Sequence, residues 1–124
     1  MKTIVKISDA EWEVMNLIWE KSPLPASEVV DQLSVKKGWR ARTTRTLLDR
    51  LVKKRALSTR LEGKRYLYHS KVTAEDCVRR ETRSFLARVF GGKPGALLLN
   101  LAKETELSRE EIQELKRILE EKEK

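Results

Sequence analysis

Residues 41–70, ARTTRTLLDRLVKKRALSTRLEGKRYLYHS, contain the change of pattern that decides the fold. Over residues 41–55 the apolar side chains recur every three or four positions, as on one face of an α-helix. Residues 56–61 and 65–70 lose this period and indicate two strands, with a glycine-containing turn between them. The stretch therefore predicts a helix followed directly by a β-hairpin.

Two further helices are expected before this stretch. Residues 8–11, SDAE, form a capping box that predicts the start of a helix over residues 8–21. Residues 22–25, SPLP, end that helix, and a shorter one is expected over residues 26–33. Three helices followed by a two-stranded wing is the order of a winged helix-turn-helix domain. We therefore expect a DNA-binding domain of this fold in residues 1–72.

Helical periodicity returns after the hairpin and predicts three more helices, over residues 73–90, 96–103 and 108–121. Together they carry more apolar surface than three short helices bury alone, and a dimer would bury it. We therefore expect residues 73–124 to form a helical dimerisation domain, which makes the whole chain mainly α with a small β-hairpin. The alternative is that these helices pack back on the winged domain. The expected dimer contacts are Leu97, Leu98, Leu101, Ile112, Leu115 and Leu119.

The net charge of +8 is unevenly distributed along the chain. Residues 1–72 hold 16 Lys and Arg against 8 Asp and Glu, whereas residues 73–124 hold 11 of each. Residues 36–65 hold 12 basic residues against two acidic ones. Such a concentration favours a surface that binds a polyanion, because neutralised phosphates release their condensed counterions. A basic face that is merely solvated is the alternative.

The helix over residues 41–55 is expected to read the DNA. At 100° per residue, Thr44, Leu47, Leu48 and Leu51 group on an inward side, and the reverse side is basic and hydroxyl-bearing. Arginine pairs bidentately with guanine, and threonine contacts thymine methyl groups, base edges or phosphates. The alternative is a solvated helix face. The expected DNA contacts are Arg42, Thr43 and Thr46 to bases with Arg45 beside them, Arg50 and Arg40 to the backbone, and Lys64 and Arg65 from the wing.

Several classes of protein are disfavoured by what the sequence lacks. One cysteine and one histidine do not supply the usual ligands of a zinc site, so we expect no metal. No glycine-rich phosphate loop and no nucleophile paired with a base is present, so we expect neither a cofactor nor an enzyme. No apolar run approaches the roughly 20 residues of a membrane span, and the first residues lack a secretory signal, which favours the cytoplasm.

Several segments together resemble one known family. They are residues 7–15, ISDAEWEVM, with Ile18 and Trp19; Trp39 with residues 43–51, TTRTLLDRL; residues 66–68, YLY; and residues 98–101 and 107–112, LLNL and LSREEI. The combination resembles the penicillinase-repressor family of BlaI/MecI and CopY-type regulators. The resemblance implies a dimeric transcriptional repressor that binds a palindromic operator, often of β-lactam resistance genes.

The resemblance also implies how repression is relieved. In the β-lactam systems of that family, a membrane sensor-transducer with a zinc protease domain leads to cleavage of the repressor after an asparagine. The matching bond here is Asn100–Leu101, where the family often has phenylalanine in the second position. The copper-responsive branch carries a C-terminal cysteine cluster that this chain lacks, which argues against copper sensing.

Two other functional classes share part of this pattern. A non-specific nucleic-acid-binding or architectural protein would share the basic charge but not the recognition face. A protein-interaction module could use the winged helix as a scaffold, because fold alone does not fix function. The ratio of affinities for specific and random DNA at fixed salt separates the first of these from a repressor.

Overall fold

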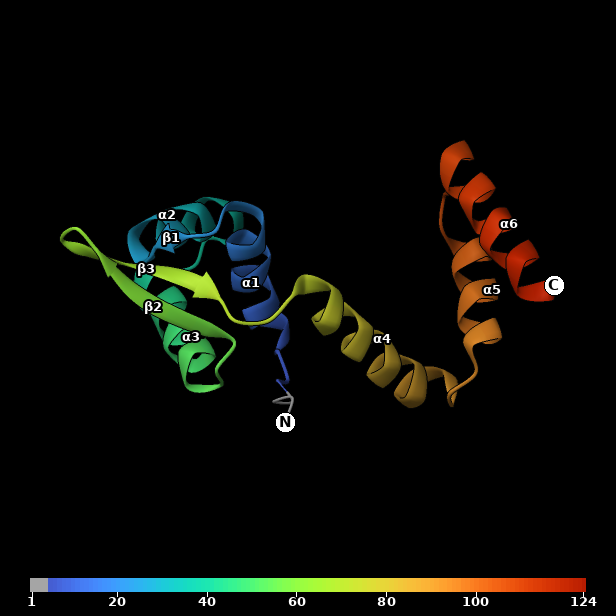
Figure 1. The fold of residues 1–124 in the computed structure, drawn as a ribbon, viewed down its shortest axis with the longest axis horizontal. Helices are drawn as coiled ribbons and strands as arrows, with labels where there is room; N and C mark the ends of the chain where they lie inside the picture. The colour runs from blue at the N-terminus through green and yellow to red at the C-terminus, as the bar shows by residue number, and fades with distance from the viewer. Residues whose placement is uncertain (1–4) are drawn as a thin grey trace. The chain divides into compact units, whose positions relative to one another are not determined.

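The computed structural model describes residues 5–124, and it confirms a mainly α chain with a small sheet (Figure 1). Three helices precede the hairpin and three follow it, as the sequence predicted. The elements are α1 (Asp9–Lys21), β1 (Leu24–Pro25), α2 (Ala26–Lys37), α3 (Ala41–Lys53), β2 (Leu57–Glu62), β3 (Arg65–Ser70), α4 (Ala74–Phe90), α5 (Pro94–Glu104) and α6 (Arg109–Glu123).

The chain divides into two compact units, Met1–Arg80 and Glu81–Lys124, and α4 contributes to both. Cys77, near the start of α4, is buried in the core of the first unit, in agreement with its interpretation as a small apolar core residue. The domain boundary expected between residues 72 and 73 falls at the N-terminus of α4 and stays a prediction.

The hairpin forms where the sequence predicted it, with Glu62 in the first strand rather than in the turn. β2 and β3 pair antiparallel from Leu57 opposite Ser70 to Glu62 opposite Arg65, which leaves a two-residue turn. Gly63 occupies the first turn position with φ 66°, a left-handed conformation that glycine adopts at little cost. The turn is therefore tight, and the hairpin forms a regular two-stranded wing.

The sheet has a third strand that the sequence did not reveal. Residues 22–25 were expected only to end the first helix, but Leu24 and Pro25 pair antiparallel with Tyr68 and Leu67 of β3. A strand of two residues shows no alternation to detect, and its proline suits an edge position. The strand order is β1-β3-β2.

Helix α2 is longer than expected. It runs to Lys37 rather than ending near Leu33, and Gly38 ends it with φ 70° and a hydrogen bond from its N–H to the Ser34 carbonyl. The predicted helix followed only the apolar positions, whereas the physical end is the glycine that can adopt the left-handed conformation. Polar residues 34–37 therefore belong to the helix.

The core of the first unit lies between α1, α2, α3 and the start of β2. The stripe expected on α1 is only partly buried: Met15 and Ile18 are fully buried, whereas Trp12 and Trp19 pack against the edge of the core. The Trp19 indole N–H donates to Ser70 Oγ and to the Val72 carbonyl, at 3.0 and 3.1 Å. Trp19 therefore ties α1 to the end of β3.

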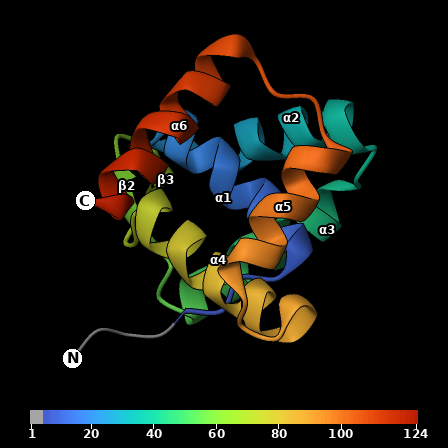
Figure 2. The same cartoon turned by 90° about the vertical axis from the view of Figure 1, so that its right-hand side faces the viewer.

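In the second unit, α5 and α6 have no buried residue. Ser108 caps α6 through the capping box expected from the sequence, in which its Oγ accepts from the Glu111 N–H and the Glu111 carboxylate accepts from the Ser108 N–H. The two helices run in opposite directions on either side of the loop that joins them (Figure 2). Their apolar side chains are therefore left without a core of their own.

Candidate nucleic-acid interface

Helix α3 separates its residues into a buried face and an exposed face. Thr44, Leu47, Leu48 and Leu51 are buried, which confirms the inward side predicted from the sequence. The residues predicted to contact DNA lie at exposed positions on and just before the helix: Arg40, Arg42, Thr43, Arg45, Thr46 and Arg50. The structure thus brings these six residues together on one solvent-facing element.

The wing carries the remaining predicted contacts. Its turn projects beyond α2 and α3, and Lys64 and Arg65 are exposed at this tip (Figure 1). Arg60 lies near them on β2 and is also exposed. The first unit therefore presents cations on both the recognition helix and the wing.

The tyrosine Tyr68 connects these two elements. It lies on β3, is half-buried, and interacts electrostatically with Asp49 and Arg45 of α3. Burial raises the pKa of the Tyr68 hydroxyl, Asp49 raises it further, and Arg45 acts in the opposite direction. The Tyr68 hydroxyl therefore lies within electrostatic reach of the exposed flank of α3, while β2 packs against the same helix.

Acidic residues of α1 neutralise only some of the basic residues. Glu13 pairs with Lys36 at 3.6 Å and Lys37 at 3.1 Å, and Glu11 pairs with Lys54. Within residues 5–124, by contrast, no ion pair includes any of the eight residues predicted to contact DNA. The six cations of the candidate interface are therefore all available to bind a polyanion.

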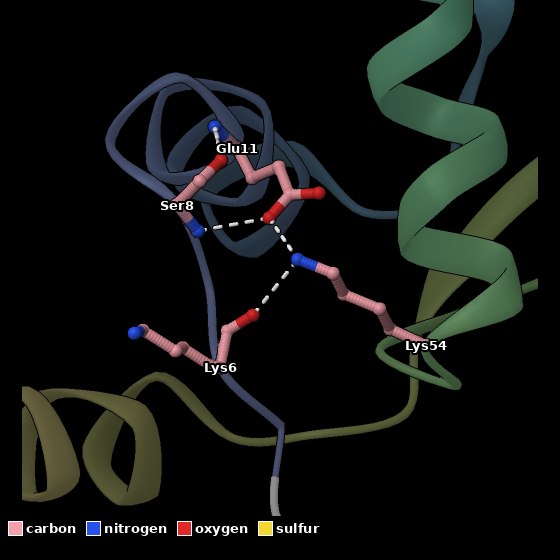
Figure 3. A network of polar contacts seen from close by, with 4 residues as sticks. All are labelled: Lys6, Ser8, Glu11 and Lys54. Atoms are coloured by element: carbon pink, nitrogen blue, oxygen red, sulfur yellow. Dashed lines mark hydrogen bonds and ion pairs between the residues drawn. The ribbon is translucent and has the colours of Figure 1, made fainter.

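The C-terminal end of α3 is held by a polar network centred on the buried carboxylate of Glu11 (Figure 3). Lys54, the C-cap residue of α3, donates from Nζ to Glu11 Oε1 at 2.5 Å and to the Lys6 carbonyl at 2.9 Å. The same carboxylate oxygen accepts the Ser8 N–H at 2.8 Å, and Ser8 Oγ accepts the Glu11 N–H. The network therefore connects the start of α1 to the end of the recognition helix.

The sequence predicted only part of this network. The capping box of Ser8 and Glu11 is confirmed. However, the sequence did not indicate a partner for Lys54, which contacts a carboxylate that is 1% exposed. The two partners are 43 positions apart, so no local pattern links them. The choice not to count Lys54 among the DNA contacts agrees with its place in this network.

The ionisation of Glu11 follows from its surroundings. Burial alone would raise the pKa of the carboxyl, but the hydrogen bond from Lys54, the hydrogen bonds from Ser8 and the Lys54 charge outweigh it. The pKa of Glu11 therefore lies below its ordinary value, and the ion pair is charged near neutral pH.

The residues expected to form the dimer contacts lie on α5 and α6. Leu98, Leu101, Ile112, Leu115 and Leu119 are exposed, and Leu97 is half-buried. Asn100, at the expected cleavage position, is exposed and helical. The expected dimer set omitted further exposed apolar residues of this unit, of which the largest are Phe85, Val89, Leu99 and Ile118.

Over residues 5–124, no group of three or more His, Cys, Asp or Glu side chains could hold a metal ion. None of the helices in this range is long and apolar enough to cross a membrane.

Comparison with known proteins identifies close relatives over nearly the full length. A family described as penicillinase repressor matches residues 7–121. A penicillinase repressor of Bacillus licheniformis is 41% identical over 121 residues, which cover 98% of this chain and 94% of the relative. The methicillin resistance regulatory protein MecI of Staphylococcus aureus (strain N315) is 37% identical over 117 residues, which cover 94% of this chain and 95% of that protein.

Two solved structures confirm the fold of the DNA-binding part. The solution structure of the DNA-binding domain of the repressor BlaI matches with a TM-score of 0.55 and 42% identity, covering 61% of this chain and 93% of that one. The solution structure of monomeric Bacillus licheniformis BlaI in complex with the blaP half-operator matches with the same values. The winged helix predicted from the order of helices and hairpin is thereby confirmed.

Proposed function

The chain belongs to the penicillinase repressor family, a family of repressors rather than enzymes, and on this premise we propose that it is a dimeric repressor that binds a palindromic operator. The observation that carries the proposal is the set of cations on α3 and the wing that have no carboxylate partner within residues 5–124. Its relatives are named for penicillinase and methicillin resistance, so we propose antibiotic-resistance genes as the target. The protein would then act in the cytoplasm, where its operator lies.

In this proposal α3 enters the major groove with its exposed face. Arg42 pairs with a guanine, Thr43 and Thr46 contact base edges or thymine methyl groups, and Arg45 reads the groove beside them. Arg40 and Arg50 hold phosphates, as do Lys64 and Arg65 on the wing. Base contacts specify the sequence and backbone contacts fix the position of the helix.

The second unit supplies the dimer contact. Leu98, Leu101, Ile112, Leu115 and Leu119 are exposed in the single chain, although leucine and isoleucine side chains are stabilised by burial, at about 25 cal/mol per Å². A second copy would cover them through a symmetric interface. Two copies would then present two α3 helices to the half-sites of an inverted repeat.

We further propose that cutting the Asn100–Leu101 bond, by a protease controlled by a membrane sensor-transducer, relieves repression. The exposure of Asn100 and Leu101 supports access to the bond, and their place inside α5 requires local unfolding before cleavage. A cut there would remove Leu101 and all of α6 from the dimer contact. Binding of the operator by residues 1–100 as tightly as by the full chain would contradict this step.

The repressor proposal is tested by selecting binding sites from random duplexes with the full chain. The expected result is enrichment of an inverted repeat, bound at least about a thousandfold more tightly than random DNA at the same salt concentration. A strong salt dependence alone is expected of any basic DNA-binding protein. Absence of an enriched sequence would instead favour the non-specific architectural class.

A further inference from the structure

The wing ends in an apolar pair that nothing in the first unit covers. Leu61 of β2 lies directly opposite Tyr66 of β3, and each residue is 59% exposed. The next pair along the hairpin is Glu62 with Arg65, followed by the turn that carries Lys64. Large apolar side chains are therefore exposed on the part of the wing that is richest in cations.

The register shows which face of the hairpin bears this pair. Cross-strand partners share a face, and alternate pairs along a hairpin lie on the same side. Leu61 with Tyr66 therefore shares a face with Thr59–Tyr68 and Leu57–Ser70. Leu57 is fully buried and Tyr68 packs against the core, so this is the inner face of the wing.

The inner face continues from the recognition helix to the tip of the wing. Tyr68 interacts with Arg45 and Asp49 on the exposed flank of α3, and Tyr66 lies one pair further out along the same face. A duplex that fills its major groove with α3 brings the adjoining strand backbone toward this face. The apolar pair is therefore placed where the DNA leaves the helix and meets the wing.

We infer that Leu61 and Tyr66 pack against the deoxyribose walls of the minor groove beside each half-site, an inference that rests on the proposed function. The charge at the tip selects this occupant, because Lys64 in the turn and Arg60 and Arg65 on the opposite face of the same hairpin disfavour an uncharged protein surface and favour a polyanion. Nucleic acid offers phosphates and apolar sugar edges together. Apolar side chains are used in this way by many proteins that contact the minor groove.

Salt dependence distinguishes this contact from a cationic one. A lysine that neutralises a phosphate releases counterions and steepens the dependence of affinity on salt, whereas an apolar contact releases none. Removing Leu61 and Tyr66 is therefore expected to lower affinity equally at every salt concentration. Removing Lys64 is expected to weaken binding and reduce the slope of log affinity against log salt by about 1.

The experiment compares the full-length double variant Leu61→Ala/Tyr66→Ala with Val35→Ala, a control that removes an apolar side chain 90% exposed on α2. Operator affinity is measured at several salt concentrations, and hydroxyl-radical footprinting reports the protection of each deoxyribose. The double variant is expected to bind about tenfold more weakly with an unchanged slope, the loss expected for partial exposure of two apolar side chains. It is also expected to lose sugar protection beside each half-site, whereas Val35→Ala binds as the parent does.

Thermal unfolding and one further variant separate a lost contact from a damaged hairpin. Tyr66→Phe keeps the ring and is expected to retain most of the affinity and the footprint. Unchanged affinity and footprint in the double variant would overturn the inference, as would a reduced salt slope or a loss of affinity explained by unfolding. If the parent selects no operator, the proposed function itself fails; if Arg42→Ala weakens operator binding while the double variant does not, only the role of this pair fails.

Discussion

The first unit buries most of its apolar side chains and exposes cations on one helix and the wing, whereas the second unit leaves its apolar side chains exposed. In the first unit Leu47, Leu48 and Leu51 line the core while the arginines of the same helix stay unpaired. In the second unit Arg117 pairs with Glu114 on its own helix, while Ile112 and Leu115 remain exposed. The surfaces that the two units expose therefore differ in kind, which suits the first to a polyanion and the second to an apolar partner.

The largest expected effect comes from placing charge on the apolar surface of the second unit. Ile112→Asp/Leu115→Asp should convert a dimer to a monomer, because each buried carboxylate would lack a partner. Loss of the tethered second half-site should then weaken operator binding by about a hundredfold or more. Analytical ultracentrifugation and gel-shift titration measure the two effects.

The matched control for this variant is Gln113→Asp, which adds a charge at an exposed polar position of the same helix. It should leave both the oligomeric state and the operator affinity unchanged. A double variant that remains dimeric would show that α6 is not the dimer surface, and the contrast between the units would lose its functional meaning.

A smaller effect is expected from breaking the ion pair between Lys54 and Glu11. Lys54→Met leaves the buried Glu11 carboxylate without its half-exposed cation and should lower the free energy of unfolding by about 2 kcal/mol. Lys53→Met removes a neighbouring exposed charge and should change stability by less than about 0.5 kcal/mol. Urea unfolding of both variants tests whether the free energy of unfolding depends more on Lys54 than on Lys53.

Within the first unit, loss of a base contact and loss of a backbone contact should have different effects on the affinities for operator and random DNA. Arg42→Ala should cost about 1–3 kcal/mol on the selected operator and much less on random DNA, because a bidentate guanine contact is lost. Lys64→Ala should weaken both DNAs similarly. Fluorescence anisotropy titrations on the two duplexes give these ratios. Equal losses on both DNAs for Arg42→Ala would remove it from the base-reading set.

The smallest expected effect is a pH dependence of stability. The pKa of Glu11 is lower in the folded chain than its ordinary value, so the unfolded state binds more protons in the acidic range. Its stabilisation is therefore complete above the ordinary glutamate pKa of about 4.3 and is lost as pH falls through the lowered folded pKa. Glu11→Gln should flatten the fall of the urea midpoint below that pH. If Glu11→Gln leaves the pH dependence of the urea midpoint unchanged at low pH, Glu11 has an ordinary pKa in the folded chain.

Local patterns predicted the elements and the two faces of α3, because burial of Thr44, Leu47, Leu48 and Leu51 follows directly from helical spacing. The same reasoning placed the hairpin, whose glycine turn fixes its register. It could not find β1, which is too short to alternate, or the partner of Lys54, which lies far away in the sequence. It also did not indicate that Leu61 and Tyr66 would be opposite each other and uncovered, since that depends on register and on where the core ends.

The two-residue turn at Gly63 and Lys64 restricts how such a wing can diverge between related chains. Inserting a single residue in one strand would turn the residues beyond it to the opposite face, unless a bulge absorbed the change. Leu61 and Tyr66 would then no longer share a side of the hairpin. Lengthening of the wing between the core and this pair must therefore add two residues to each strand if the pair is to stay on the inner face, because one added residue per strand would turn both side chains to the outer face.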